Sequence, residues 1–374
     1  MALAALGWGS ARPGVRVAYF YKPPFDTTAV VVAARSRLVI LTHGDEDYRA
    51  KLRRAGYAGP LLQYIAANEA EGPGPYANTH AACDAAYRPY QRTVADRAGV
   101  FCRQIHPHES WFLHNRQGER LWSRQRSADG VWRTTYLMNP ASPGWRAFLI
   151  ARLRQYRRLG WDGFFLDNVD LSRAGLLRQP EDRGGVAEYP TDAAYRAAEV
   201  GYLQALRTAF PHVPLWANLT HDPGEAGGWG VYLAQLDGVM VENFGLGWRR
   251  SPLAAAARAA QWQNVRAALA AGKSVLAVEQ GGRGDWRRLQ MGLALYWALQ
   301  PAPGQLYFRY GDADDQDYRT LWWYPAYAFQ PPPALGPLTG AGLEWRRRYP
   351  DGELKLDLAA GSATLPPAWA HAWR

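Results

Sequence analysis

Short apolar runs alternate with longer amphipathic segments along most of the chain. A short continuous apolar run is typical of a strand buried on both faces of a parallel sheet. Strands are predicted at residues 15–21, 38–42, 60–65, 163–166, 213–218, 238–244, 274–280 and 305–310. Helices are predicted at residues 27–35, 47–55, 143–159, 191–210, 225–235, 252–271 and 285–299. Strands that alternate with helices indicate parallel βα units, and this set predicts an α/β fold of the (β/α)8 TIM barrel type.

Two stretches depart from the alternation. Residues 66–138 form a long excursion, and a connection of this length is usually functional. Near the C-terminus, Asp351-Gly352 lies between two alternating segments, 344–349 and 353–358, which predicts a β-hairpin. We therefore expect a barrel over residues 13–323, followed by a Pro-rich connection and a small β appendage over residues 324–374. A doubly wound sheet is the alternative, but the chain lacks the Gly-rich phosphate turn after its first strand.

Acidic and amide side chains follow several of the predicted strands. The apolar run Gly163-Phe164-Phe165-Leu166 leads directly into Asp167 and Asp170, and an unpaired buried charge is very costly. These carboxylates should therefore emerge at the C-terminal rim of a barrel, where the strand ends converge on one cavity. Glu242 and Glu279 follow the sixth and seventh strands in the same way. The other candidates around this rim are Tyr21, Lys22, His43, Asn168, Asn218, Asn243, Gln280 and Arg309.

Carboxylates that face each other across a cleft suit the cleavage of a glycosidic bond. That reaction needs one carboxylic acid to protonate the leaving oxygen and one carboxylate to attack or to activate water. We expect Asp167 and Glu242 to be this pair. A strand-end Asp can instead cap a helix or bind a neighbouring amide, and Asp170 is a candidate for that role. Glu279 is expected to order the rim or to contact substrate.

The sequence gives weaker support for a metal site or for other kinds of catalytic chemistry. His106-Pro107-His108-Glu109 lies in the excursion and has no His-x-x-x-His partner, and the acidic run at 312–317 lacks the Gly of a calcium loop. A nucleophile elbow and a phosphate loop are both missing. We therefore predict no metal and no cofactor.

The composition is that of a folded protein with an excess of positive charge. The chain is 48% hydrophobic and 20% charged, with a formal net charge of +10 that comes mostly from Arg. The basic residues are scattered, so nucleic-acid binding is not expected, and no apolar run is long enough to span a membrane. The 17 Trp and 21 Tyr residues supply flat rings that can stack on sugars.

Two features bear on where the protein works. Cys83 and Cys102 could form one disulfide bond, which would fit an exported protein. The apolar start, residues 1–11, is either the remnant of an export signal or a loose end. Together they favour a secreted or cell-envelope location over the cytoplasm, and we expect a monomer.

The segments 163–170 and 237–243 resemble those of hypothetical glycosyl hydrolase family 15, which is distantly similar to the endo-α-1,4-polygalactosaminidases of glycoside hydrolase family 114. Further motifs that carry the resemblance are His106-Pro107, Trp111-Phe112-Leu113-His114, Leu137-Met138-Asn139-Pro140, Trp145 and residues 321–327. The resemblance implies that Asp167 is a nucleophile and Glu242 an acid/base. Asn243 stands where the polygalactosaminidase pattern would have an acidic residue.

We therefore predict a glycoside hydrolase that acts on a polysaccharide or glycan, with a retaining mechanism favoured. The first alternative is a barrel that binds carbohydrate without cleaving it. The second is a metal-dependent hydrolase or deacetylase. The distance between Asp167 and Glu242 separates the first alternative from the enzyme, because a pair more than about 12 Å apart could not act on one bond.

Overall fold

The structure is a computed structural model, and it describes residues 14–73, 83–84, 92–126, 131–177, 184–220, 228–248, 251–299, 304–311 and 318–373. The apolar start at 1–11 and the acidic run at 312–317 lie outside these residues. Within the described ranges, no helix combines the length and the apolar character needed to cross a membrane.

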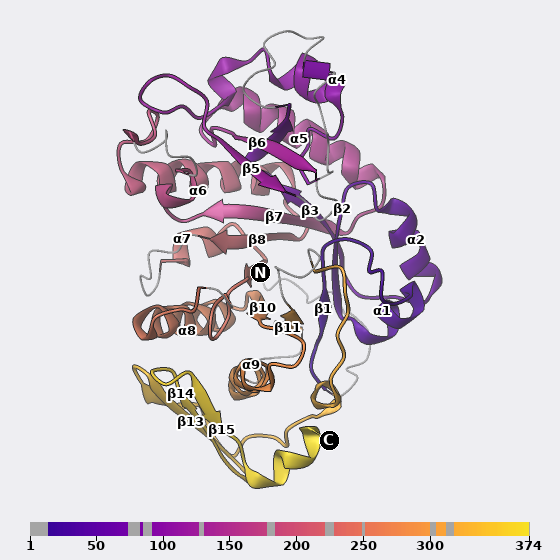
Figure 1. The fold of residues 1–374 in the computed structure, drawn as a ribbon, viewed down its shortest axis with the longest axis vertical. Coiled ribbons are helices and arrows are strands. Elements are labelled where there is room, and N and C mark those ends of the chain that lie inside the picture. The colour runs from indigo at the N-terminus through magenta and orange to yellow at the C-terminus, as the bar shows by residue number, and fades with distance from the viewer. Residues whose placement is uncertain are drawn as a thin grey trace.

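A parallel sheet of eight strands forms the centre of the molecule (Figure 1). In sheet order, the strands are β1 (Ala18–Tyr19), β2 (Leu38–Thr42), β3 (Leu61–Ala66), β7 (Gly163–Asp170), β8 (Leu215–Thr220), β9 (Gly238–Val241), β10 (Ser274–Gln280) and β11 (Leu306–Gly311). Val17, directly before β1, pairs with Phe308 of β11 and joins the two edges of the sheet. The predicted (β/α)8 barrel is confirmed.

Helices connect the strands and cover the outside of the barrel (Figure 1). They are α1 (Ala29–Arg35), α2 (Glu46–Arg54), α5 (Pro143–Arg158), α6 (Asp192–Ala209), α7 (Gly230–Leu233), α8 (Ala255–Ala270) and α9 (Trp286–Leu299). Three of them begin after a residue whose hydroxyl accepts a backbone N–H of the first turn, namely Thr28, Ser142 and Thr191. Such caps satisfy donors that the helix itself leaves unpaired.

The side chains of β7 alternate between the inside and the outside of the barrel. Phe165 pairs with Tyr64 of β3 and Trp216 of β8, and all three belong to the buried cluster inside the barrel. Phe164 and Leu166 belong instead to the larger cluster beneath the helices. Because the side-chain period of a strand is two residues, Asp167 follows Phe165 onto the inner face.

The long excursion between β3 and α5 forms a small antiparallel sheet of its own. Its strands are β4 (Glu69–Gly72), β5 (Trp122–Arg126) and β6 (Trp132–Leu137), in the order β4-β6-β5, and its short helical turns are α4 (Ala98–Val100), η1 (Phe101–Ile105) and η2 (Glu109–Trp111). Cys83 and Cys102 are joined by a disulfide bond, with Cα atoms 5.9 Å apart. The pairing that the sequence left open is therefore present in the structure.

The C-terminal sheet packs against the barrel helix α9 at the other end of the molecule from the excursion (Figure 1). Its antiparallel strands are β12 (Thr339–Ala341), β13 (Glu344–Tyr349), β14 (Gly352–Asp357) and β15 (Ser362–Thr364), and the turn η7 (Pro367–Trp373) follows. The predicted hairpin is the β13–β14 pair. Arg347 Nη1 donates to the carbonyl oxygens of Ala298 and Leu299 at 2.5 and 2.9 Å, so a side chain of the sheet satisfies the end of α9.

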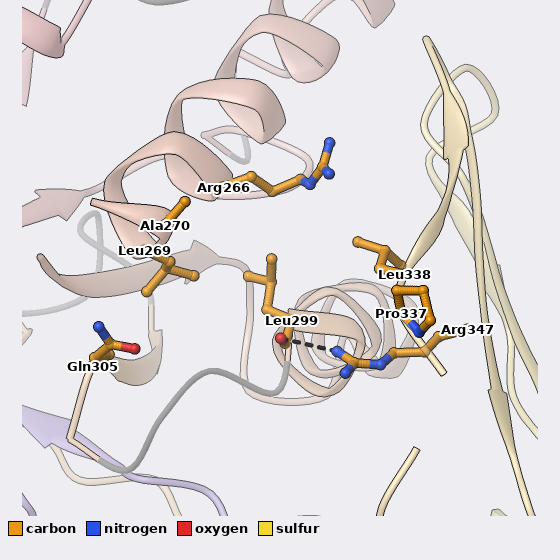
Figure 2. Close-up of a pocket in the computed structure, with 8 residues that line it drawn as sticks. All are labelled: Arg266, Leu269, Ala270, Leu299, Gln305, Pro337, Leu338 and Arg347. Carbon is orange, nitrogen blue, oxygen red and sulfur yellow. Dashed lines mark hydrogen bonds between the residues drawn. The ribbon is translucent and has the colours of Figure 1, made fainter. Parts of the chain in front are cut away.

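A cleft of about 390 Å³ lies where this sheet meets α8 and α9 (Figure 2). Arg266, Leu338 and Arg347 are among the residues that line it. Gln305, directly before β11, also lines it. The cleft therefore lies near the N-terminal ends of the strands, whereas Asp167 lies in the C-terminal half of β7 and Glu242 directly follows β9.

Candidate active site

Asp167 and Glu242 are held together by one amide group. Asn218 Nδ2, from β8, donates to Asp167 Oδ1 at 2.9 Å and to Glu242 Oε2 at 2.9 Å. These two carboxyl oxygens therefore lie no farther apart than twice 2.9 Å. The strand between the two acids thus supplies the group that bridges them.

Two tyrosines hold the outer oxygens of the pair. Tyr64 of β3 donates its hydroxyl to Asp167 Oδ2. Tyr318, which follows β11, donates its hydroxyl to Glu242 Oε1 at 3.1 Å. Each of the four carboxyl oxygens therefore has a donor, and both acids remain half-buried rather than sealed in the core.

Burial and mutual repulsion shift the protonation of the pair. Burial, and then the nearby charge of Asp167, raises the pKa of Glu242 to about 7. Burial also raises the pKa of Asp167, although the hydrogen bonds from Tyr64 and Asn218 act in the opposite direction. Two carboxyl groups this close cannot both ionise at low cost. A carboxyl group with a pKa near 7 can serve as an acid in one step and as a base in the next.

The backbone changes direction directly after Asp167. The register between β7 and β8 shifts between Leu166 and Val169, and Asn168 adopts a left-handed conformation with φ of 55°. Asn168 Nδ2 donates to Glu69 Oε1 at 2.9 Å, which ties this bulge to the excursion. Bulges beside active sites commonly redirect a side chain, and here the bulge directly follows Asp167.

Three more predicted residues lie at the pair or next to it. Gln280 Nε2 donates to the backbone oxygen of Glu242 at 2.8 Å and to the hydroxyl of Tyr318. The ring of Tyr21 lies 5.0 Å from that of Tyr64, between centroids. Arg309 is buried behind Tyr318, and its Nη2 donates to the backbone oxygen of that residue at 3.2 Å.

Asp170 and Lys22 both have partners away from the pair. Asp170 Oδ1 accepts the hydroxyl of Thr220 at 2.6 Å. Lys22 donates to the hydroxyl of Thr42.

Asn243 and Glu279 both support the loop after β9. Asn243 Oδ1 accepts Nε2 of Gln261 at 2.9 Å. Glu279 is fully buried on the outer side of β10, where it accepts the backbone N–H of Leu246 at 3.2 Å and lies 3.4 Å from Arg288 Nη1. Both hold the segment that carries Glu242.

His43 belongs to a charged network on the end of β2. Its ring lies between Asp96, at 3.0 Å, and Glu46, at 3.2 Å, and it stacks on Tyr156. Burial lowers the pKa of His43, but the hydrogen bonds to Asp96 and Glu46 outweigh it and raise the pKa to about 9. His43 is therefore a cation that two carboxylates already neutralise.

The sequence did not single out Tyr64 or Tyr318. Tyr64 had a readable signal, because it lies on a predicted strand close to its C-terminal end. Tyr318 had none, because it follows the eighth strand in a segment without periodicity. Among the residues that the structure describes, no three His, Cys, Asp or Glu side chains are grouped to hold a metal ion.

A barrel with an Asp and a Glu paired at its strand ends is an arrangement typical of glycoside hydrolases. The chain belongs to hypothetical glycosyl hydrolase family 15, whose family model matches residues 76–353. This finding confirms the resemblance that the motifs carried. Among curated proteins, no sequence gives a significant match.

Several solved structures are similar to this chain at low sequence identity. The glycoside hydrolase domain of PelA from Pseudomonas aeruginosa has a TM-score of 0.50 and 16% identity, covering 83% of this chain and 97% of that domain. An α-galactosidase from Thermus thermophilus has a TM-score of 0.49 and 15% identity, with coverages of 94% and 67%. Ega3 from Aspergillus fumigatus, solved with galactosamine, has a TM-score of 0.46 and 14% identity, with coverages of 84% and 98%. At 16% identity, the likeness to the PelA domain shows a common fold and no more.

Proposed function

We propose that the protein is a retaining glycoside hydrolase that cleaves a polysaccharide or glycan, with Asp167 as nucleophile and Glu242 as acid/base. The observation that carries this proposal is the shared hydrogen-bond donor, Asn218 Nδ2, which keeps the nearest carboxyl oxygens within twice 2.9 Å. Retaining enzymes place their two carboxyl groups about 5–5.5 Å apart, and inverting enzymes about 6.5–9.5 Å. The close pairing supports the retaining course.

The reaction would proceed in two displacements. In the first, an Asp167 oxygen bonds to the anomeric carbon while the bond to the glycosidic oxygen breaks, and the proton of Glu242 passes to that leaving oxygen. In the second, the Glu242 carboxylate removes a proton from water, the water oxygen bonds to the anomeric carbon, and the ester bond to Asp167 breaks. The first step starts from protonated Glu242 and the second from ionised Glu242. A pKa of about 7 supports the assignment of both roles to this residue.

The surroundings of the pair favour cleavage over binding alone. The hydroxyl groups of Tyr64 and Tyr318 hold the two carboxyl groups in place. A barrel that only binds sugar would have no need for two acids within reach of one bond, because each carboxyl group costs free energy to bury.

The test compares wild type with Asp167→Asn on a panel of polysaccharides and glycans. Wild type should release sugars from at least one of them, and Asp167→Asn should lose activity by about 10⁴-fold or more while it keeps its fold. Asp162→Asn is the matched control. Asp162 precedes the same strand at its opposite end, where it pairs with Arg53 at 2.6 Å.

Two outcomes would reject the proposal. Activity close to wild type in Asp167→Asn would show that Asp167 is not the nucleophile. Sugar binding by wild type without any turnover would favour a barrel that only binds carbohydrate. The stereochemical course is read by NMR from the anomer that is released first, and inversion would contradict the retaining mechanism. Azide should restore turnover to Asp167→Gly by taking the place of the missing carboxylate.

A further inference from the structure

Tyr318 has an unusual backbone conformation. Its φ is 60°, and among the described residues Asn168 is the only other non-glycine residue with a positive φ. One of the two directly follows Asp167, and the other donates its hydroxyl to Glu242. A bulky residue in the left-handed region is strained, and such residues tend to be kept where function requires them.

A buried cation holds Tyr318 in this conformation. Arg309 Nη2 donates to the backbone oxygens of Tyr318 and Thr320, at 3.2 and 2.5 Å. The guanidinium group itself lies over the rings of Tyr19 and Phe20, at 5.1 and 5.8 Å from their centroids. Arg309 therefore fixes the segment that carries Tyr318, and it does so from the core, without touching the carboxyl pair.

The surrounding contacts also fix the direction of the phenol proton. The backbone oxygen of Glu242 can only accept, so the nitrogen of Gln280, at 2.8 Å, must face it. The same nitrogen donates to the Tyr318 hydroxyl, whose oxygen is therefore the acceptor in that contact. The one proton of the phenol is then left for Glu242 Oε1, at 3.1 Å.

We propose that Tyr318 is a positioning residue for Glu242, which orients its carboxyl group and stabilises its ionised form for the second step of the reaction. This inference rests on the proposed function. Among the described residues, the titratable groups that act on Glu242 are Asp167, whose charge opposes ionisation, and Tyr318, whose hydrogen bond favours it. The neutral amide of Asn218 also favours ionisation through its hydrogen bond, and the neutral amide of Gln280 bonds to the Glu242 backbone. Tyr318 thus counteracts part of the cost that burial and Asp167 impose on the carboxylate.

The test follows the titration of Glu242 directly and needs no substrate. The protein is labelled with ¹³C at the Glu carboxyl carbon, and the Glu242 signal is assigned by its loss in Glu242→Gln. In Tyr318→Phe, the pKa of Glu242 should rise by about one pH unit, because the carboxylate loses a donor. Tyr324→Phe is the matched control. Tyr324 is also buried near the strand ends, but its hydroxyl donates to the backbone oxygen of Arg283 at 2.8 Å.

A second variant keeps the test decisive if Tyr318→Phe fails to fold. 3-Fluorotyrosine at position 318 retains the ring and the hydroxyl but donates a stronger hydrogen bond, so the pKa of Glu242 should fall. An unchanged Glu242 pKa, or an equal shift in Tyr324→Phe, would overturn the inference. The proposed function is judged separately, by turnover in wild type and its loss in Asp167→Asn, so the two can fail independently.

Discussion

At the scale of single residues, the central feature is one amide between two acids. Asn218 donates one N–H to Asp167 and the other to Glu242, and it leaves each acid one oxygen for a tyrosine. Hydrogen bonds to a carboxylate favour its ionised form, whereas burial and a like charge oppose it. The balance differs for the two acids, and this difference supports the two tasks that we propose for them.

The pH dependence of activity should report the protonation of Glu242. The first displacement that we propose needs Glu242 protonated, and burial raises the pKa of this group to about 7. We therefore expect kcat/KM to fall as the pH rises through about 7, on whichever substrate the panel identifies. Circular dichroism over the same range excludes unfolding as the cause. Undiminished kcat/KM up to two pH units higher would contradict the role of Glu242 as the acid.

At the scale of elements, a buried acid joins α6 to the excursion. Glu199 of α6 is fully buried, and its Oε1 accepts Asn68 Nδ2 and the Tyr195 hydroxyl, both at 2.7 Å. Burial raises the pKa of Glu199 from 4.5 to about 8. Asn68 directly precedes Glu69, which contacts Asn168, so this helix supports the bulge after Asp167.

Glu199→Gln should make the protein more stable at neutral pH. The folded state keeps a proton on Glu199 that the unfolded chain releases above pH 4.5, so folding stability falls as the pH rises from 4.5 toward 8. A neutral Gln removes this dependence. The gain in unfolding free energy at pH 7 should be on the order of 2–3 kcal/mol, and it should vanish near pH 4.5.

Urea unfolding of wild type and Glu199→Gln at both pH values measures this gain. The control is Glu344→Gln, because Glu344 is an exposed acid on β13. This substitution should change the unfolding free energy little at either pH. A gain of equal size at pH 4.5 and pH 7 would show that packing, and not proton binding, is the cause.

At the scale of the whole molecule, the barrel carries two additions at different ends (Figure 1). The excursion between β3 and α5 leads from the strand of Tyr64 and carries Glu69 beside Asn168. The C-terminal sheet instead covers α9, and the cleft beside them (Figure 2) is lined in part by Gln305, directly before the N-terminal end of β11. The excursion is therefore the addition that can influence the site.

Removal of the disulfide bond should destabilise the protein. Cys83 and Cys102 are both fully buried and are 19 residues apart in sequence. The double variant Cys83→Ala/Cys102→Ala should lose about 3 kcal/mol of unfolding free energy, because the unfolded chain regains the freedom of that loop. Reductant should lower the Tm of wild type toward that of the double variant and leave the variant unchanged. A Tm of wild type that does not respond to reductant would contradict the prediction.

Much of this arrangement could be predicted from the sequence, because it rests on local periodicity. Apolar runs and helical segments are readable one by one, and a parallel barrel needs little more than their alternation. The position of Asp167 followed from the apolar run before it, and the end of a strand is where such a charge can leave the core. The family motifs then paired it with Glu242.

The sequence by itself determined the order of strands and helices and the acids at the strand ends. The tertiary structure decided which of those side chains meet. Glu279 and Gln280 are neighbours at the end of one strand, yet Gln280 contacts the Glu242 backbone, while Glu279 faces Arg288 on the outside. The reason is that adjacent residues of a strand point to opposite faces. A shift of one residue in register would therefore exchange the side chain that faces the site with the one that faces the core. Contacts across a barrel depend on that register, which no local pattern contains.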